Sequence, residues 1–152
     1  MYGAIFDTKI GTLLAKATNE SITNLEFATN YNNYKDNVPI LKDLKKWIDN
    51  YLNGGNPKID FNLSPHGTDF QKKIWDFVSK ISYGKTATYT DIANIYGNKN
   101  SVRAIGQAIK TNPILLLIPC HRIVAKNCIG GYCGKEKIEI KELLLKMENN
   151  SK

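Results

Sequence analysis

A cysteine and a histidine stand next to each other at Cys120 and His121, directly after Pro119. A thiolate is a strong nucleophile, and a neighbouring imidazole can take the thiol proton and lower the pKa of a cysteine from its ordinary value of about 8.5. Because proline bars a helix from continuing, the cysteine is expected at a turn that exposes its side chain. Most cysteines outside disulfides are small buried hydrophobes, however, so the pair alone does not establish catalysis.

Composition argues against several other kinds of site. The cysteines Cys120, Cys128 and Cys133 and the histidines His66 and His121 do not have a standard zinc spacing. Three cysteines late in the chain make a poor disulfide framework and favour a reducing compartment. The N-terminus lacks the pattern of a signal peptide, and no apolar run approaches the 18 or more residues that span a bilayer. We expect a cytoplasmic protein without a metal site.

The net charge of +7 is distributed unevenly along the 152 residues. Residues 1–63 hold 7 Lys+Arg and 7 Asp+Glu, whereas residues 64–152 hold 14 and 7. A basic half beside a neutral half is typical of a protein that meets a polyanion with one face, although many lysine-rich surfaces are merely solvated. Charge alone leaves both interpretations open.

The first 63 residues predict a small domain without evident chemistry. An apolar pattern at helical spacing predicts an amphipathic helix over 40–52 that ends at Gly54–Gly55. The sequence Ser64-Pro65 marks a boundary, so we expect an N-terminal domain over 1–63 and a C-terminal domain over 64–152. The segments with the pattern of short strands, the first three forming a meander, are 2–8, 12–18, 22–28 and 59–63.

The second half predicts mainly helices. Thr68 is placed to cap a core helix that ends before Tyr83–Gly84, and the position of His66 in the turn before it favours a surface role. A closing amphipathic helix is predicted over 138–147. Its predicted inward residues are Leu143, Leu144 and Met147.

Between them lie two short helices separated by Gly97–Asn100, with Ser101 as N-cap of the second. This is the anatomy of a helix-turn-helix. Gly106 inside the second helix costs about 1 kcal/mol relative to alanine. Together with Ala104 it leaves a flat surface around Arg103, which suits the narrow minor groove better than the major groove. Close internal packing of Gly106 is the alternative.

The stretch from Asn112-Pro113 to Pro119-Cys120-His121-Arg122-Ile123-Val124 closely resembles the active-site signature of the 6-O-alkylguanine-DNA alkyltransferases. These repair proteins accept an alkyl group from damaged DNA on a cysteine of their own. The resemblance extends from about Gly67 to Glu148 and includes Val102-Arg103-Ala104-Ile105-Gly106. It implies an α+β fold: a small antiparallel sheet with a helix, ribonuclease H-like in topology, followed by a mainly helical domain with a helix-turn-helix.

The resemblance also implies a reaction and a partner. A stacked base must rotate out of the duplex before a thiolate can reach its alkyl carbon. The implied partner is therefore double-stranded DNA, bound by a monomer through the minor groove without sequence preference. Each molecule acts once, and no cofactor is needed because the DNA donates the group.

Residue by residue, the resemblance makes Cys120 the alkyl acceptor, His121 its general base through water, and Glu148 the carboxylate that orients the histidine. Asn112 forms the turn that leads into the cysteine loop, and Tyr89 contacts the rotated nucleotide near its 3′ phosphate. The residues implied to face DNA are Ser101, Arg103, Ala104 and Gly106. Those implied to line the guanine pocket are Val124, Gly130, Tyr132 and Cys133.

Two residues near Cys120, Leu115 and Arg122, are not among the implied site residues. Leu115 stands where the family often has proline in the loop before the cysteine. Arg122 is expected to form an ion pair that braces the two halves.

Three other functions are compatible with parts of the pattern. A binder of damaged bases that performs no chemistry could share the fold, but relatives of that type replace the cysteine. A transcription regulator would read the major groove, which the flat surface at Ala104 and Gly106 argues against. A cysteine hydrolase would turn over an ester or a peptide.

Overall fold

The computed structural model describes residues 1–28, 34–125 and 138–150, and it forms two compact units. Unit 1 comprises Met1–His66 together with Pro113–Leu115, and unit 2 comprises Gly67–Asn112 and Leu116–Lys152. The first unit thus ends three residues after the boundary that the sequence predicts, and it also takes in a short piece of the segment before Cys120. In the described residues, no helix is long and apolar enough to cross a membrane.

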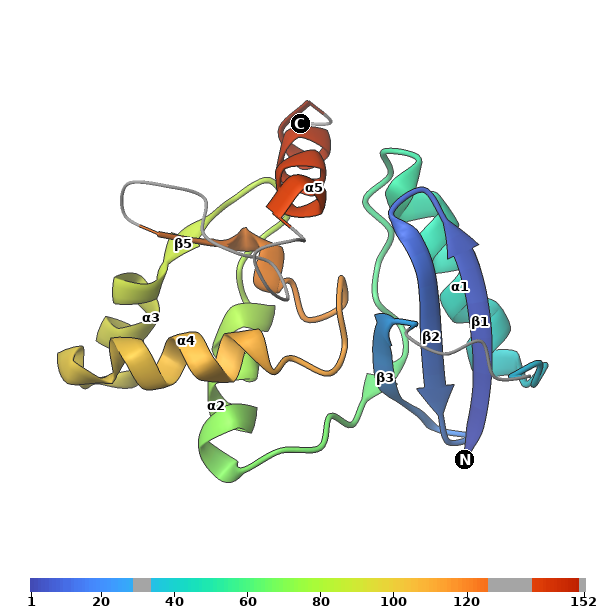
Figure 1. Ribbon diagram of the computed structural model, residues 1–152, viewed down its shortest axis with the longest axis horizontal. Helices are drawn as coiled ribbons and strands as arrows, with labels where there is room; N and C mark the ends of the chain where they lie inside the picture. Colours follow the sequence, from blue (N-terminus) through green and yellow to red (C-terminus); the bar gives the residue numbers. More distant parts are fainter. Residues whose placement is uncertain (29–33, 126–137, 151–152) are drawn as a thin grey trace. The chain divides into compact units, whose positions relative to one another are not determined.

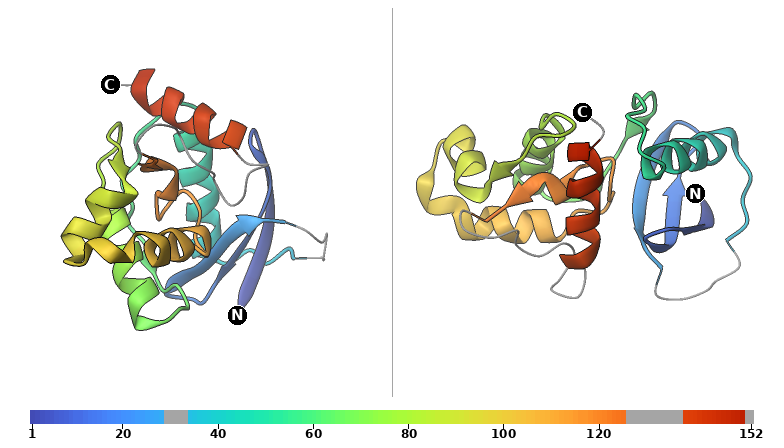
Figure 2. Two further views of the ribbon diagram at one scale, coloured as in Figure 1. Left: turned by 60° about the vertical axis from the view of Figure 1, so that its left-hand side comes forward. Right: turned by 90° about the horizontal axis from the view of Figure 1, so that it is seen from above.

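Unit 1 is a sheet with one helix, and its meander is confirmed. Strands β1 (Tyr2–Thr8), β2 (Gly11–Ala17) and β3 (Ser21–Phe27) pair antiparallel in that order. Helix α1 (Pro39–Leu52) packs along this sheet through its apolar face, which buries Leu44 and Ile48 (Figures 1 and 2). Alternating side chains of the strands supply the other half of the core. The fold class predicted from the sequence is confirmed.

The fourth strand of this sheet differs from the prediction. Strand β4 covers only Asn62–Leu63, and it runs parallel to β3 rather than antiparallel. The chain passes from β3 through α1 to β4, and a crossover connection through a helix allows the parallel direction.

The segment before the cysteine joins the same sheet. Leu25 N–H donates to Pro113 O and Leu115 N–H donates to Leu25 O, each at 2.8 Å, which makes a parallel bridge between Leu25 and Ile114. A proline at position 115 could not donate this second bond. The leucine at this position therefore anchors the loop to β3 through its backbone.

Unit 2 is mainly helical. Its helices are α2 (Asp69–Ser79), α3 (Tyr89–Tyr96), α4 (Val102–Lys110) and α5 (Ile138–Asn150). Helices α2, α3 and α4 pack against one another, and Trp75 Nε1–H donates to Ala108 O at 2.8 Å (Figures 1 and 2). Strands β5 (Ala87–Thr88) and β6 (Ile123–Val124) pair in parallel and link the start of α3 to the segment after the cysteine.

The helix termini follow local sequence signals, with one exception. Thr68 caps α2 in a capping box with Gln71, and Thr88 caps α3 in the same way with Asp91. Gly97 ends α3 in the left-handed region at a φ of 96°, which favours glycine. Ser101 occupies the N-cap position of α4, but its side chain makes no capping hydrogen bond. A single turn of 3₁₀ helix, Lys99–Ser101, leads directly into α4 and replaces the extended backbone that a capping serine needs.

Candidate active site

Cys120 begins a 3₁₀ turn, Cys120–Arg122, which follows Pro119 and leads into β6. Its N–H donates to Ile118 O at 2.7 Å, and Arg122 N–H donates to Pro119 O at 2.9 Å. The apolar run before it is buried, and the turn folds the cysteine inward, so that Cys120 is only 4% exposed. The prediction of an exposed side chain is wrong. Because burial disfavours a thiolate, ionisation of this sulfur depends on nearby groups that take its proton or balance its charge.

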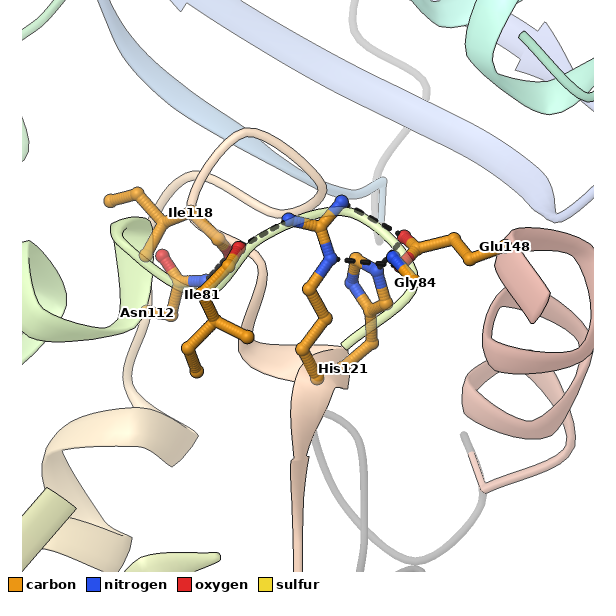
Figure 3. Close-up of polar contacts among 7 residues, drawn as sticks. Ile81, Gly84, Asn112, Ile118, His121 and Glu148 are labelled. Atoms are coloured by element: carbon orange, nitrogen blue, oxygen red, sulfur yellow. Dashed lines mark hydrogen bonds and ion pairs between the residues drawn. The ribbon is translucent and has the colours of Figure 1, made fainter. Parts of the chain in front are cut away.

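The loop that carries the cysteine is held by Asn112. Its side chain is buried, and its Nδ2–H donates to Ile118 O at 2.9 Å, which closes the loop from residue 112 to residue 118 (Figure 3). Within the loop, Leu116 adopts a φ of 67°, a left-handed conformation that costs a non-glycine residue about 1–2 kcal/mol. A conformation of this kind persists only where surrounding contacts enforce it, so the loop geometry is specific.

His121 and Glu148 form a buried pair. His121 Nε2 lies 2.7 Å from Glu148 Oε2, and the two side chains are 0% and 1% exposed (Figure 3). Glu148 lies in α5, 27 residues further along the chain. The carboxylate also accepts from Arg122 Nε at 2.9 Å, from Arg122 Nη2 at 3.1 Å and from Gly84 N–H at 3.1 Å. It is therefore bonded on both oxygens.

Arg122 makes its contacts inside unit 2. Besides the forked pair with Glu148, its Nη1 donates to Ile81 O at 2.8 Å, and its guanidinium lies 5.7 Å from the centre of the Tyr83 ring. The prediction of an ion pair between the two halves is wrong. The arginine instead ties the turn of the cysteine to α5 and to the segment after α2. Its position beside His121 on a tight turn directs it to the same carboxylate.

The charge state of His121 follows from these surroundings. Burial lowers the pKa of His121 below its usual range, and the cations Arg122 and Lys141 lower it further, whereas the hydrogen bond and charge of Glu148 raise it. Burial has the largest effect, so the imidazole is neutral and can accept a proton. Because Nε2 faces a carboxylate, we assign the ring proton to Nε2, which leaves the basic lone pair on Nδ1.

Helix α4 exposes one face to solvent. Ile105, Ala108 and Ile109 are buried, whereas Arg103 and Ala104 are exposed and Gly106 lies on the same open side. Among the described residues, no heavy atom lies within 4 Å of a Cβ built at Gly106. The alternative interpretation of this glycine as a close internal packing site is therefore wrong. Val102, the first residue of the helix, is half-buried.

Comparisons with known proteins agree over the whole chain. Residues 1–65 match the family model "6-O-methylguanine DNA methyltransferase, ribonuclease-like domain", and residues 69–150 match "6-O-methylguanine DNA methyltransferase, DNA binding domain". The chain belongs to the 6-O-methylguanine-DNA methyltransferase family.

Individual relatives of this methyltransferase family support the assignment. The chain is 34% identical to the methylated-DNA–protein-cysteine methyltransferase of Methanosarcina acetivorans over 99% of both chains. It is also 34% identical to the constitutive enzyme of Bacillus subtilis, over 99% of this chain and 96% of the other. The crystal structure of Mycobacterium tuberculosis OGT in complex with DNA aligns with a TM-score of 0.88 at 29% identity, covering 99% of this chain and 94% of that one.

The structure of this methyltransferase-family chain brings the backbone of Tyr89, predicted to contact the rotated nucleotide, close to that of the predicted pocket residue Val124. Tyr89 is the first residue of α3 and is half-buried. The residue before it, Thr88, pairs with Val124 in the short parallel sheet, so Tyr89 and Val124 start from adjacent backbone positions. Gly130, Tyr132 and Cys133 lie outside the described residues.

Sequence reasoning missed one residue of the site and misplaced another on the same helix. Lys141 is 0% exposed, although lysine is rarely buried. The buried face of α5 carries Lys141, Leu144 and Glu148, and Leu143, predicted to point inward, is 50% exposed. Positions 141, 144 and 148 share one helical face, so treating Glu148 as buried would have placed Lys141 beside it. Met147 is half-buried. In the described part of the chain, no three metal-ligating side chains gather.

Proposed function

We propose that Cys120 is the residue onto which this protein transfers the alkyl group of 6-O-alkylguanine in DNA. The protein is a methylated-DNA–protein-cysteine methyltransferase that acts in DNA repair. The observation that carries the assignment is the buried 2.7 Å contact between His121 and Glu148, with Cys120 in the same turn as His121. A nucleophile, a base and an orienting carboxylate in this relation are the components by which enzymes activate a weak nucleophile.

The chemistry balances without a cofactor. His121 accepts the thiol proton of Cys120, directly or through one water, and the neutral Nδ1 lone pair is its acceptor. The sulfur attacks the alkyl carbon in line with the leaving oxygen, so that the S–C bond forms as the C–O bond breaks. The bonding electrons pass to the guanine, which becomes unmodified guanine by taking up one proton, with Tyr89 as the donor that we assign. His121 then releases the thiol proton to solvent and Tyr89 takes up a proton from solvent, so that both side chains return to their neutral forms. The product thioether is stable, so each molecule reacts once.

The partner is DNA, and we assign its contact surface to α4. An exposed face with Ala104 and Gly106 lets the helix backbone approach a narrow groove closely, which supports docking in the minor groove. To Arg103 on that face we assign the role of filling the gap that a rotated nucleotide leaves in the stack. Contacts to phosphate carry no sequence information, so binding is expected to be salt-sensitive and independent of sequence.

We assign the guanine pocket to Val124, Gly130, Tyr132 and Cys133, with Tyr89 as the residue that contacts the rotated nucleotide. The pairing of Thr88 with Val124 supports the assignments of Val124 and Tyr89, since it holds the start of α3 beside the segment that follows the cysteine turn. All of the polar contacts of the site described above lie within unit 2 of a single chain, which supports action as a monomer.

The test is incubation with a short duplex that carries labelled 6-O-methylguanine, followed by mass analysis of peptides. One labelled methyl group per chain on Cys120 is expected. Cys120→Ser should abolish labelling, whereas the matched variants Cys128→Ser and Cys133→Ser should keep it. Label on another residue, or release of more than one equivalent of repaired DNA, would overturn the assignment.

A further inference from the structure

The Glu148 carboxylate contacts Arg122 and the Gly84 N–H as well as His121. Both of its oxygens are used twice: Oε1 accepts from Arg122 Nε and Gly84 N–H, and Oε2 accepts from Arg122 Nη2 and lies against His121 Nε2. An arginine fork on a carboxylate fixes its plane as well as its charge. The orientation of His121 therefore depends on Arg122 as much as on Glu148.

Charged groups of both signs lie near the His121 ring in the described part of the chain. The described groups around it come from three elements: Arg122 and the Cys120 thiol from the 3₁₀ turn, Glu148 and Lys141 from α5, and Tyr83 with the Gly84 N–H from the segment after α2. The imidazole has no exposed surface, and burial disfavours its charged form. The positive charges of Arg122 and Lys141 act in the same direction as burial and favour the uncharged ring.

We propose that Arg122 and Lys141 are positioning residues of the alkyl transfer: Arg122 holds the Glu148 carboxylate, and both cations oppose its charge so that His121 stays an uncharged proton acceptor. This rests on the proposed function, in which His121 takes the proton of Cys120. A buried histidine beside an unopposed carboxylate would instead bind a proton at rest, and a protonated base could not accept one from the thiol.

Removal of either cation should shift the pKa of His121 in a defined direction. Because each cation lowers the pKa of His121, its loss should raise that pKa, and the acidic limb of the pH profile should move to higher pH. In Lys141→Met, which keeps a similar side-chain length, the single-turnover rate at about pH 6 should fall roughly tenfold relative to its value at about pH 8.5. Arg122→Met should show the same shift together with a lower maximal rate, since the fork on Glu148 is lost.

Two matched variants separate charge from structure. Arg122→Lys keeps the positive charge but not the fork, so it should retain the acidic limb of the parent while its maximal rate falls. Lys45→Met makes the same substitution as Lys141→Met at an exposed position of α1 and should leave the profile unchanged. A uniform loss of rate at all pH values in Lys141→Met and Arg122→Met, with no shift of the limb, would overturn the proposal.

A direct measurement avoids dependence on activity or on the folding of the variants. The chain has two histidines, so His66→Gln leaves His121 as the sole source of imidazole signals. Nitrogen NMR of that protein should show the proton on Nε2 and a neutral ring at neutral pH, titrating below free histidine. A ring that is protonated at neutral pH, or the Nδ1–H tautomer, would overturn the inference even if Cys120 is alkylated. A failure of labelling at Cys120 with a neutral Nε2–H ring would instead count against the proposed function alone.

Discussion

The interiors of the two units differ in what they bury. Within the described residues, Thr23 is the buried polar residue of unit 1, whose core otherwise consists of apolar side chains such as Leu13 and Leu44. Unit 2 buries Asn112 together with the ionisable residues His121, Lys141 and Glu148. Buried charges are weak contributors to stability and often mark functional sites. The comparison indicates that the core of unit 1 serves the fold, whereas part of the core of unit 2 serves the reaction.

The difference between the two cores can be tested by destabilising each of them by a similar amount and measuring the alkyl-transfer rate. Leu44→Ala in α1 should lower the free energy of unfolding by about 2–5 kcal/mol, because it leaves a cavity. Glu148→Gln should lower it by about 3–5 kcal/mol, because Arg122 loses its buried counter-charge. Per folded molecule, however, the alkyl-transfer rate should fall by a factor on the order of 100 or more only in Glu148→Gln. Denaturant unfolding and single-turnover kinetics measure the two quantities.

Glu142→Gln is the matched control for this pair, since Glu142 lies on the exposed side of the same helix. It should change neither stability nor rate. A comparable loss of rate per folded molecule in Leu44→Ala would show that the core of unit 1 is coupled to the reaction, and the contrast between the units would fail.

A second prediction distinguishes the role of the unit 2 surface in DNA binding from the role of its interior in the chemical step. Arg103→Ala should slow transfer from duplex DNA by roughly tenfold to a hundredfold, because the nucleotide must then rotate out without a side chain to fill the stack. Reaction with free 6-O-methylguanine base should keep its rate, and the free energy of unfolding should change by less than about 0.5 kcal/mol. Lys110→Ala, at the other end of the exposed face of α4, is the control. An equal loss on base and duplex would count against a role in nucleotide rotation.

Much of the fold was predictable because it is encoded locally. Strand patterns marked β1 to β3, helical periodicity marked α1, Thr68 marked the start of α2, and Gly97 marked the end of α3. The proximity of Cys120 and His121 was also visible, since they are adjacent in sequence. Glu148 was identified only through its family motif, because nothing local distinguishes a buried glutamate near a chain end from a solvated one.

The remainder depends on packing between distant segments. The sequence shows that α5 is amphipathic, but which of Leu143 and Lys141 faces inward depends on where the helix docks. The burial of Cys120 depends on the closure of its loop by Asn112. The partner of Arg122 follows from the same docking, since the carboxylate arrives from α5. These were the points at which the predictions were wrong or incomplete.

The buried charges of unit 2 also predict how acid affects stability. The unfolded chain protonates its histidines near pH 6.5, whereas buried His121 has a lowered pKa and stays neutral. At pH values between the pKa of His121 in the unfolded chain and its lower pKa in the folded chain, the unfolded state binds more protons than the folded state. The free energy of unfolding should therefore fall as the pH drops below about 6.5, by at most about 1.4 kcal/mol per pH unit for this group. Urea unfolding of His66→Gln with and without His121→Asn, at about pH 7.5 and 5.5, isolates the effect. An unchanged slope after His121→Asn would exclude His121 as its source.

The smallest predicted effect concerns Gly106, a helix-destabilising residue on the surface of unit 2 rather than in its core. At Gly106 the described residues leave open space for a methyl group, so Gly106→Ala should stabilise α4 by up to about 1 kcal/mol. The same methyl group would stand between the helix and the groove, and duplex affinity should fall several-fold. Gly97→Ala is the matched control: the described chain leaves it equally open, but its φ of 96° makes alanine strained, so it should destabilise without weakening binding by the folded protein. If Gly106→Ala is more stable than the parent and binds DNA as tightly, the absence of a side chain at position 106 does not serve contact with the duplex. The described residues of unit 2 that serve function at the expense of stability would then be those of its buried cluster.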